Sequence, residues 1–372
     1  QRAMLAIVVV CALLTYGGVS LFVVVFAVYP FAAELFRQSD IPKRLIPGTI
    51  AVGAFTFTMD ALPGTPQIQN IIPTAFFGTT SWAAPVLGIL GGVFILIVGM
   101  TYLEWRRRVA LANGDGYASG VELRNEPDPF RGDHPAHPLV ALLPLVMVGV
   151  SNFLLTRWIP MLYGTSHEFI PSTIGSPAPV VQEVAKMSAI WAVQGALLSG
   201  ILTVLAFAGK PVAASVAEGT KNAVNRAMLA SMNTASEYGF GAVIAALPGF
   251  LVVANALQAI PNPLVNEAIS VTALAGITGS ASGGMSLALA AMADSFIANA
   301  NAAGIPMEVL HRVASMASGG MDTLPHNGAV ITLLAVTGRS HRQSYKDIFA
   351  ITLIKTSAVF VVIGVFYATG LV

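Results

Sequence analysis

The chain has 372 residues, of which 55% are hydrophobic and only 10% are charged. Soluble domains carry about 25% charged residues, so this chain cannot cover a surface that faces water on all sides. A soluble enzyme, a secreted disulfide scaffold and a disordered protein are therefore excluded. A net charge of +1 gives no basic character suited to nucleic acid, and the single cysteine, Cys11, excludes an internal disulfide.

The first part of the chain, residues 1–105, alternates apolar runs with glycine and proline. Apolar runs on both sides of Tyr16-Gly17-Gly18 predict a re-entrant hairpin over residues 1–36. The run over 45–77 is interrupted between Asp60 and Pro66, which predicts a broken transmembrane helix. An unbroken span follows over 86–104, which is long enough to cross about 30 Å of hydrocarbon.

The middle of the chain contains polar connections and long apolar spans. Residues 106–137 are expected to form a cytoplasmic loop, and residues 159–179 a shorter polar loop. Residues 138–258 contain three spans, at 139–156, 184–208 and 227–258, and are expected to form a static scaffold. Both loops are interpreted as solvated connectors.

The last part of the chain, residues 265–372, repeats the organisation of the first. A second hairpin is expected over 265–300, around Gly279-Ser280-Ala281-Ser282-Gly283-Gly284. A second broken helix is expected over 308–338, interrupted at residues 318–325, and a final helix over 348–369. The fold class predicted is therefore an all-α polytopic membrane protein with two re-entrant hairpins and two broken helices.

Short motifs recur in the same order in both parts. Gly17-Gly18-Val19-Ser20-Leu21 matches Gly283-Gly284-Met285-Ser286-Leu287, and Met59-Asp60-Ala61-Leu62-Pro63 matches Met321-Asp322-Thr323-Leu324-Pro325. These matches predict an internal repeat, as in many secondary transporters. The second repeat has three spans ahead of its hairpin and the first has none, so we expect helices to be missing before Gln1.

The distribution of basic residues predicts that the repeats are inverted. The link over 37–44 after the first hairpin carries three basic residues, whereas the link over 299–307 after the second carries none. By the positive-inside rule, the first hairpin enters from the cytoplasm and the second from outside. A few basic residues do not fall on the cytoplasmic side under this rule. Two of them, Arg312 and Lys355, are interpreted as extending their side chains to a membrane interface. Inverted repeats are typical of transporters with alternating, elevator-type access.

Both hairpin tips and both helix restarts offer polar groups for a ligand. Half-helix N-termini aimed at the membrane midplane bind anions without a formal cation, and Thr65 and Thr323 are the expected caps, ahead of restarts at Pro66 and Pro325. A small carboxylate with hydroxyl groups is the ligand that such a site predicts. The predicted substrate-binding residues are Thr15, Gly17, Gly18, Ser20, Thr65, Gln67, Ser280, Ser282, Gly283, Gly284, Ser286, Thr323, His326 and Asn327.

Three intramembrane carboxylates are candidates for proton coupling, since such groups are costly and usually functional. Asp60 and Asp322 occupy matching breaks, and Glu237 lies about two turns into a span. The alternative is that each aspartate caps a half-helix. Asp322 is the favoured coupling residue, because His326 lies one turn further on and could relay its proton. No cluster of residues has metal-ligand spacing, no ATP-binding motif is present, and no cofactor is expected.

Several segments resemble the gluconate permease (GntP) family of the ion transporter superfamily. They include Leu14–Phe26, Ala61–Asn70 and Ala75–Thr80, while Ala245–Phe250 and Ser318–Gly328 are similar to its 3-hydroxybutyrate permease branch. The resemblance covers essentially the whole chain. It implies a homodimeric, elevator-type proton symporter of a small hydroxy-carboxylate. The turn Met59-Asp60-Ala61-Leu62-Pro63-Gly64 lacks the histidine of the sugar-acid members, which favours 3-hydroxybutyrate over gluconate.

The sequence thus favours a non-enzymatic transporter in a bacterial inner membrane, whose partners are a small organic anion, a proton and lipid. Two other classes stay open. Asp60 and Asp322 could form the dyad of an intramembrane aspartyl protease, although both follow a methionine and lack the motifs of such proteases. An anion channel is the second alternative, and it would conduct without saturable, proton-dependent uptake.

Overall fold

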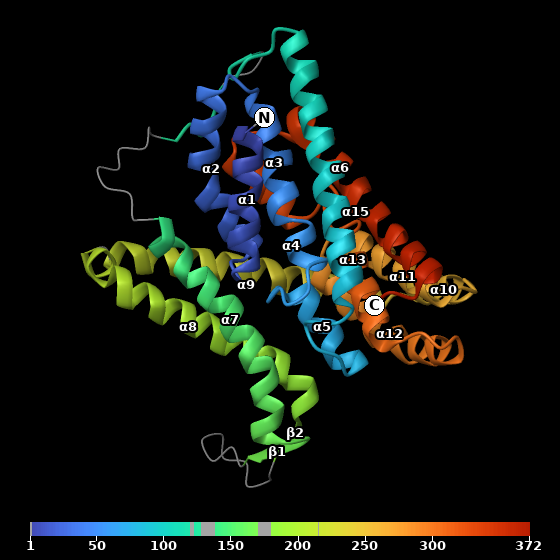
Figure 1. Ribbon diagram of the computed structural model, residues 1–372. Coiled ribbons are helices and arrows are strands. Elements are labelled where there is room, and N and C mark those ends of the chain that lie inside the picture. The colour runs from blue at the N-terminus through green and yellow to red at the C-terminus, as the bar shows by residue number, and fades with distance from the viewer. Residues whose placement is uncertain (1, 120–122, 128–137, 170–179, 215) are drawn as a thin grey trace.

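The computed structural model describes residues 2–119, 123–127, 138–169, 180–214 and 216–372. Over these residues the protein is almost entirely helical (Figure 1). Five helices in the described part are long and apolar enough to cross a membrane. They are Leu21–Gln38, Pro85–Ala112, Ile190–Lys210, Ala281–Ala302 and His341–Thr369. The prediction of an all-α polytopic membrane protein is therefore confirmed.

The first part forms a helical hairpin, an interrupted helix and a long straight helix. Its elements are α1 (Arg2–Tyr16), α2 (Leu21–Gln38), η1 (Lys43–Leu45), α3 (Ile46–Ala54), α4 (Phe57–Asp60), α5 (Ile68–Phe77) and α6 (Pro85–Ala112). The hairpin turns at Gly18, whose φ of +87° suits a residue without a side chain. Pro85 begins α6, where its missing N–H has no helical partner to lose.

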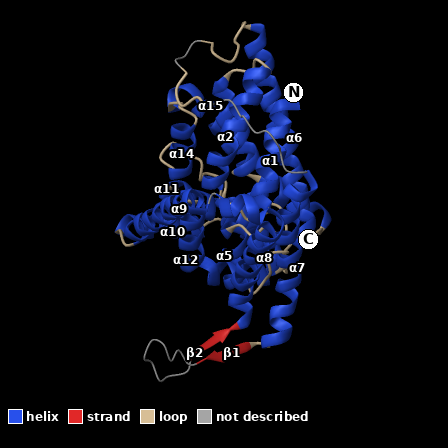
Figure 2. Ribbon diagram, turned by 90° about the vertical axis from the view of Figure 1, so that its left-hand side faces the viewer, coloured by secondary structure: helices blue, strands red, loops and turns tan. Residues whose placement is uncertain are grey.

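The middle part is built mainly from two long helices that pack side by side. Its elements are α7 (Pro138–Tyr163), β1 (Ser166–Phe169), β2 (Val180–Glu183), α8 (Val184–Ala214), α9 (Val216–Ala245) and α10 (Pro248–Gln258). The strands are antiparallel, with Ser166 opposite Glu183, and lie at the far end of the α7–α8 pair (Figure 2). The expected single span over 227–258 is wrong, because the helix ends at Ala245 and restarts at Pro248.

The last part again forms a hairpin, an interrupted helix and a long helix. Its elements are α11 (Pro263–Thr278), α12 (Ala281–Ala302), α13 (Met307–Ser318), α14 (Gly328–Val336) and α15 (His341–Thr369). Gly279 makes the hairpin turn with φ of +68°. The chain thus turns at Gly18 and Gly279, and helices are interrupted between Asp60 and Ile68 and between Ser318 and Gly328. That the two hairpins are re-entrant stays a prediction.

The buried core lies where the two parts interlock. Helix α13 packs against α5 and α11, α12 packs against α5, and α15 packs against α6 and α3. Broken helices that are distant in sequence therefore meet at the centre of the protein (Figure 1). By contrast, α8, α9 and α10 leave many large apolar side chains exposed, including Leu202, Phe207 and Val252. Such faces suit lipid or a partner subunit.

The connection after α6 is fixed to both parts by charged and polar contacts. Glu126 accepts hydrogen bonds from Lys43 Nζ at 2.5 Å, from Arg37 at 2.9 Å and from the Tyr117 hydroxyl at 2.9 Å. Burial opposes ionisation of Glu126, but these donors outweigh it and hold the pKa of its carboxyl below the usual value. Asn125 Nδ2 donates to Ala335 O at 2.7 Å, which links the same segment to the end of α14.

Candidate functional site

A small cavity of about 110 Å³ lies where the two hairpin turns meet the two helix breaks. Its walls come from both parts of the chain, and six of the residues predicted from the sequence line it. The lining residues are Ser20, Leu21, Phe22, Phe55, Gln67, Ile68, Gln69, Ser280, Ala281, Ser282, Asp322, Asn327 and Ala329. Serine hydroxyls and amide side chains make this cavity suitable for a small polar ligand with hydrogen-bonding groups.

The first hairpin turn is held in place by Gln67, the residue before α5. Gln67 Nε2 donates to Thr15 O at 2.7 Å and to Val19 O at 3.2 Å. Thr15 is fully buried, and its hydroxyl has no hydrogen-bond partner in the described part of the chain. Ser20 lines the cavity, whereas the predicted residues Thr15, Gly17 and Gly18 are not among its lining residues.

The second hairpin turn is held in the same manner by Asn327, the residue before α14. Asn327 Nδ2 donates to Gly279 O at 2.5 Å, and its Oδ1 accepts from the backbone amides of Ala329 at 2.7 Å and Val330 at 3.1 Å. Ser280 accepts from Gly283 N at 3.1 Å and so caps α12. In both parts, an amide side chain at a half-helix start thus binds the neighbouring hairpin turn.

The expected helix restarts need correction by two to three residues. Helix α5 begins at Ile68 after Gln67, and α14 begins at Gly328 after Asn327. Thr65 and Thr323 are not caps: Thr65 Oγ1 donates to Thr58 O at 2.7 Å, and Thr323 Oγ1 lies 2.5 Å from Thr352 Oγ1. Asparagine is a strong N-cap, and its side chain satisfies two free amides here.

Four of the predicted residues of the second tip lie inside a helix. They belong to the first turns of α12, which begins at Ala281, and are Ser282, Gly283, Gly284 and Ser286. Of these four, Ser282 lines the cavity. A Cβ at Gly284 would overlap the backbone of Ala275 in α11. Gly284 therefore allows α11 and α12, the two arms of the hairpin, to approach closely, and it is not part of a loop.

Asp322 is paired with a cation that the sequence analysis placed elsewhere. Lys355 Nζ donates to Asp322 Oδ1 and, at 3.0 Å, to Phe55 O at the end of α3. Lys355 is only 1% exposed, so the expectation that it snorkels to an interface is wrong. Because Asp322 and Phe55 both line the cavity, the ammonium group lies directly behind the cavity wall. The expected anion site without a formal cation is thus corrected to one with a buried lysine beside it.

Asp60 occupies the matching break, but its surroundings differ. The residue is 1% exposed, and neither carboxylate oxygen has a hydrogen-bond partner among the residues that the structure describes. Its carboxylate interacts electrostatically with Lys355, Asp322 and Arg312, and it lies against Gly319, where a Cβ would overlap it. Burial of a carboxylate without hydrogen-bond donors is costly, so Asp60 differs from Asp322, whose carboxylate is bound by Lys355.

A polar network missed by the sequence analysis lies beside Asp60. Arg312 is fully buried, contrary to expectation, and donates to Ala83 O at 2.6 Å, to Asn70 Oδ1 at 3.0 Å and to Asp60 O at 3.3 Å. His311 is also fully buried and lies 2.6 Å from Thr79 Oγ1. The available signal was two adjacent ionisable residues within an otherwise apolar segment.

Two other predicted residues lie apart from the cavity walls. His326 is exposed, and its Nε2 lies 3.1 Å from Gly276 O, so it contacts the second hairpin rather than Asp322. Glu237 lies on α9, and its side chain falls outside the residues that the structure describes. Among the described residues, no group of three or more His, Cys, Asp or Glu side chains could hold a metal ion.

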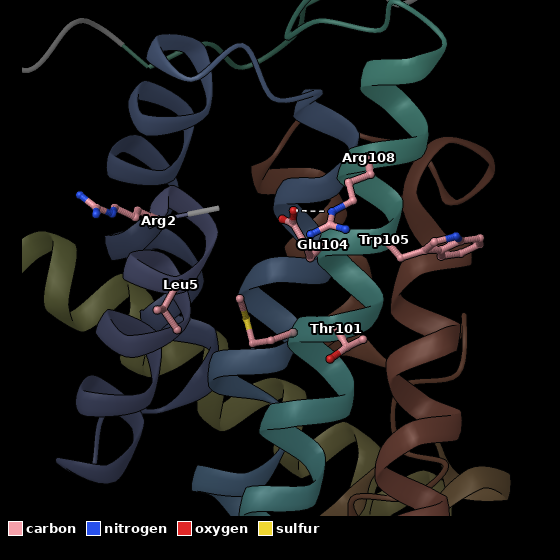
Figure 3. Close-up of a pocket in the computed structure, with 7 residues that line it drawn as sticks. Arg2, Leu5, Thr101, Glu104, Trp105 and Arg108 are labelled. Atoms are coloured by element: carbon pink, nitrogen blue, oxygen red, sulfur yellow. Dashed lines mark hydrogen bonds and ion pairs between the residues drawn. The ribbon is translucent and has the colours of Figure 1, made fainter.

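A larger cavity of about 660 Å³ lies between α1 and α6 (Figure 3), and none of the predicted substrate-binding residues lines it. Its lining residues include Arg2 and Leu5 of α1 and Thr101, Trp105 and Arg108 of α6. Trp105 is 55% exposed, as suits a residue at a membrane surface. The small central cavity is thus the place where the predicted site residues converge.

The fold and the site define a polytopic helical membrane protein with a small polar cavity at the junction of hairpins and broken helices. The chain belongs to a transporter family: it is 56% identical over 380 residues to the "Uncharacterized transporter YxjC" of Bacillus subtilis (strain 168). The match covers 100% of this chain and 80% of the relative. No protein-family model matches the chain.

Proposed function

We propose that this transporter is a secondary active symporter that moves a small hydroxy-carboxylate together with a proton across the bacterial inner membrane. The single observation that carries the proposal is the central cavity, where two hairpin turns, two half-helix starts and Asp322 converge. The resemblance to the gluconate permease family and the inverted repeats expected from the sequence support it. Inverted repeats around a central binding site are typical of transporters that alternate access between the two sides of the membrane.

The polar groups at the cavity suit both ends of a hydroxy acid. The start of α5, where no described side chain caps the helix, favours a carboxylate, because a helix N-terminus carries partial positive charge. Ser20, Ser280 and Ser282 are placed to hydrogen-bond a hydroxyl group. The ligand class proposed is therefore an anion with at least one hydroxyl group.

The size of the cavity favours the short member of the proposed substrate class. The cavity has a volume of about 110 Å³, which is small beside the roughly 300–1,000 Å³ of ligand pockets in general. A four-carbon acid such as 3-hydroxybutyrate suits this space better than a six-carbon sugar acid such as gluconate. The two acids remain the proposed substrates in this order of preference.

The surroundings of Asp60 and Asp322 argue against an intramembrane aspartyl protease. A catalytic dyad requires two carboxylates that share one proton, but Asp322 is bound to Lys355, and neither oxygen of Asp60 has a hydrogen-bond partner. The relative is moreover named as a transporter. The observations therefore favour transport over peptide cleavage.

The test is uptake by purified full-length protein in proteoliposomes. Labelled 3-hydroxybutyrate and gluconate are supplied with and without an inward proton gradient, and empty liposomes serve as the control. The proposal predicts saturable uptake of 3-hydroxybutyrate that exceeds equilibrium only when the gradient is present and collapses with a protonophore. Uptake that does not saturate and follows the membrane potential would support a channel.

A further inference from the structure

Lys355 is the one cation that directly contacts an acidic residue of the cavity wall among the described residues. Its ammonium group is held by two acceptors, the carboxylate of Asp322 and Phe55 O. An ammonium has three N–H donors, and both of its acceptors belong to residues that line the cavity. A ligand carboxylate in the cavity would therefore lie one side chain from this cation.

We propose that Lys355 is a shared counter-ion, for which Asp322 and the carboxylate of the substrate compete. The inference rests on the proposed function and adds the residue that couples the two ligands. In the empty transporter, Lys355 binds ionised Asp322. When Asp322 takes a proton from water, its bond to the ammonium weakens, and an N–H of Lys355 donates to the substrate carboxylate instead.

The charge balance explains why proton and anion move together. The empty pair contains one ammonium and one carboxylate, and the loaded site contains one ammonium, one neutral acid and one substrate carboxylate, so both states have zero net charge. Anion alone leaves one negative charge in excess, and proton alone leaves one positive charge. Unbalanced charges are costly inside a membrane protein. The site therefore favours one proton per anion and electroneutral transport.

The charged groups around the pair are compatible with this exchange. Asp60 on α4 faces Lys355 and Asp322, and Arg312 on α13 faces Asp60. Arg312 already donates hydrogen bonds to three oxygens, those of Ala83, Asp60 and Asn70. Lys355 donates to only two acceptors, Phe55 O and Asp322 Oδ1, and protonation of Asp322 would release the second.

The experiment measures binding of 3-hydroxybutyrate to purified protein by calorimetry, over about pH 5 to 8. The variants are Asp322→Asn, Lys355→Met and the double variant, with Lys346→Met as a matched control, since Lys346 is exposed on the same helix. The uncharged analogue 3-hydroxybutyramide is the control ligand. The double variant carries no unpaired charge at the pair, which preserves folding if a single variant fails to fold.

We expect binding by the wild type to weaken as pH rises, and binding by Asp322→Asn to be tight and independent of pH. The double variant should bind at least about tenfold more weakly than Asp322→Asn, since the cation is lost, and the amide should not respond to Lys355. Equal binding by Asp322→Asn and the double variant would reduce Lys355 to a structural partner and overturn this inference alone. A wild type that binds neither 3-hydroxybutyrate nor gluconate, titrated in the same way, overturns the proposed function, and the inference with it.

Discussion

At the scale of single residues, glycine next to Asp60 is a requirement of packing. Gly319 has ordinary helical dihedral angles, so an alanine there meets no backbone strain, but its Cβ would overlap the Asp60 carboxylate. We predict that Gly319→Ala lowers the free energy of unfolding by about 1–3 kcal/mol, the usual effect of overpacking. Gly364→Ala on α15 has open space around its Cβ and serves as the control. Thermal unfolding in detergent checks this, and equal melting of both variants would contradict it.

Arg312 provides a second test, because its planar group satisfies several oxygens at once. Lysine keeps the charge but cannot donate to Ala83 O, Asn70 Oδ1 and Asp60 O from one guanidinium plane. We predict that Arg312→Lys unfolds at a clearly lower temperature than the wild type, while Arg157→Lys does not. Arg157 is the comparison because its guanidinium lies 4.0 Å from the centre of the Phe153 ring, a contact that a lysine can also make. Wild-type stability of Arg312→Lys would show that the buried network is dispensable.

At the scale of elements, the sequence predicted the hairpins and breaks because their causes are local. Gly18 and Gly279 provide the positive φ of each turn, and proline or glycine interrupts each helix. The exact restarts were missed, since the choice of Asn327 over Thr323 as cap depends on contacts with the second hairpin. The partners of Lys355 and Arg312 were also missed, because they come from distant segments and leave no local pattern.

The segment after α6 gives a pH-dependent prediction at the same scale. The pKa of Glu126 is lower in the folded protein than its ordinary value of 4.5. Its stabilisation is therefore fully present above that value and is lost as the pH falls below it. We predict that wild type unfolds at a higher temperature than Glu126→Gln at neutral pH, and that this difference shrinks below about pH 4.5. A difference that is the same at every pH would exclude ionised Glu126 as its source.

At the scale of the whole molecule, the proposed elevator requires the α7–α8 pair to slide against the rest. Trp82, before α6, contacts Phe153 on α7 with ring centres 5.1 Å apart. In a background with Cys11→Ala, we predict that a short thiol crosslinker between cysteines at positions 82 and 153 stops transport reversibly. Gly195 and Leu155 lie within the α7–α8 pair, so crosslinking cysteines there should leave transport intact. Full transport with positions 82 and 153 linked would reject this division.

The exposed apolar faces of α8, α9 and α10 belong to the same scale. The resemblance to the gluconate permease family implies a homodimer, which stays a prediction, and the exposed apolar side chains of these faces suit either a second copy or lipid. The sequence could predict that these segments are apolar, but not which faces stay uncovered, because that depends on how the helices pack. The division into a moving part and a scaffold likewise remains a prediction.

The central claim, that a proton and a carboxylate are bound interdependently at this cavity, is tested most directly with Asp322→Asn in proteoliposomes. The asparagine mimics protonated Asp322, so binding no longer depends on the proton. We expect the variant still to exchange labelled for unlabelled 3-hydroxybutyrate at equal pH, but not to accumulate it when an inward proton gradient is imposed. Uphill accumulation by the variant with the pH dependence of the wild type would show that Asp322 does not couple the proton to the anion.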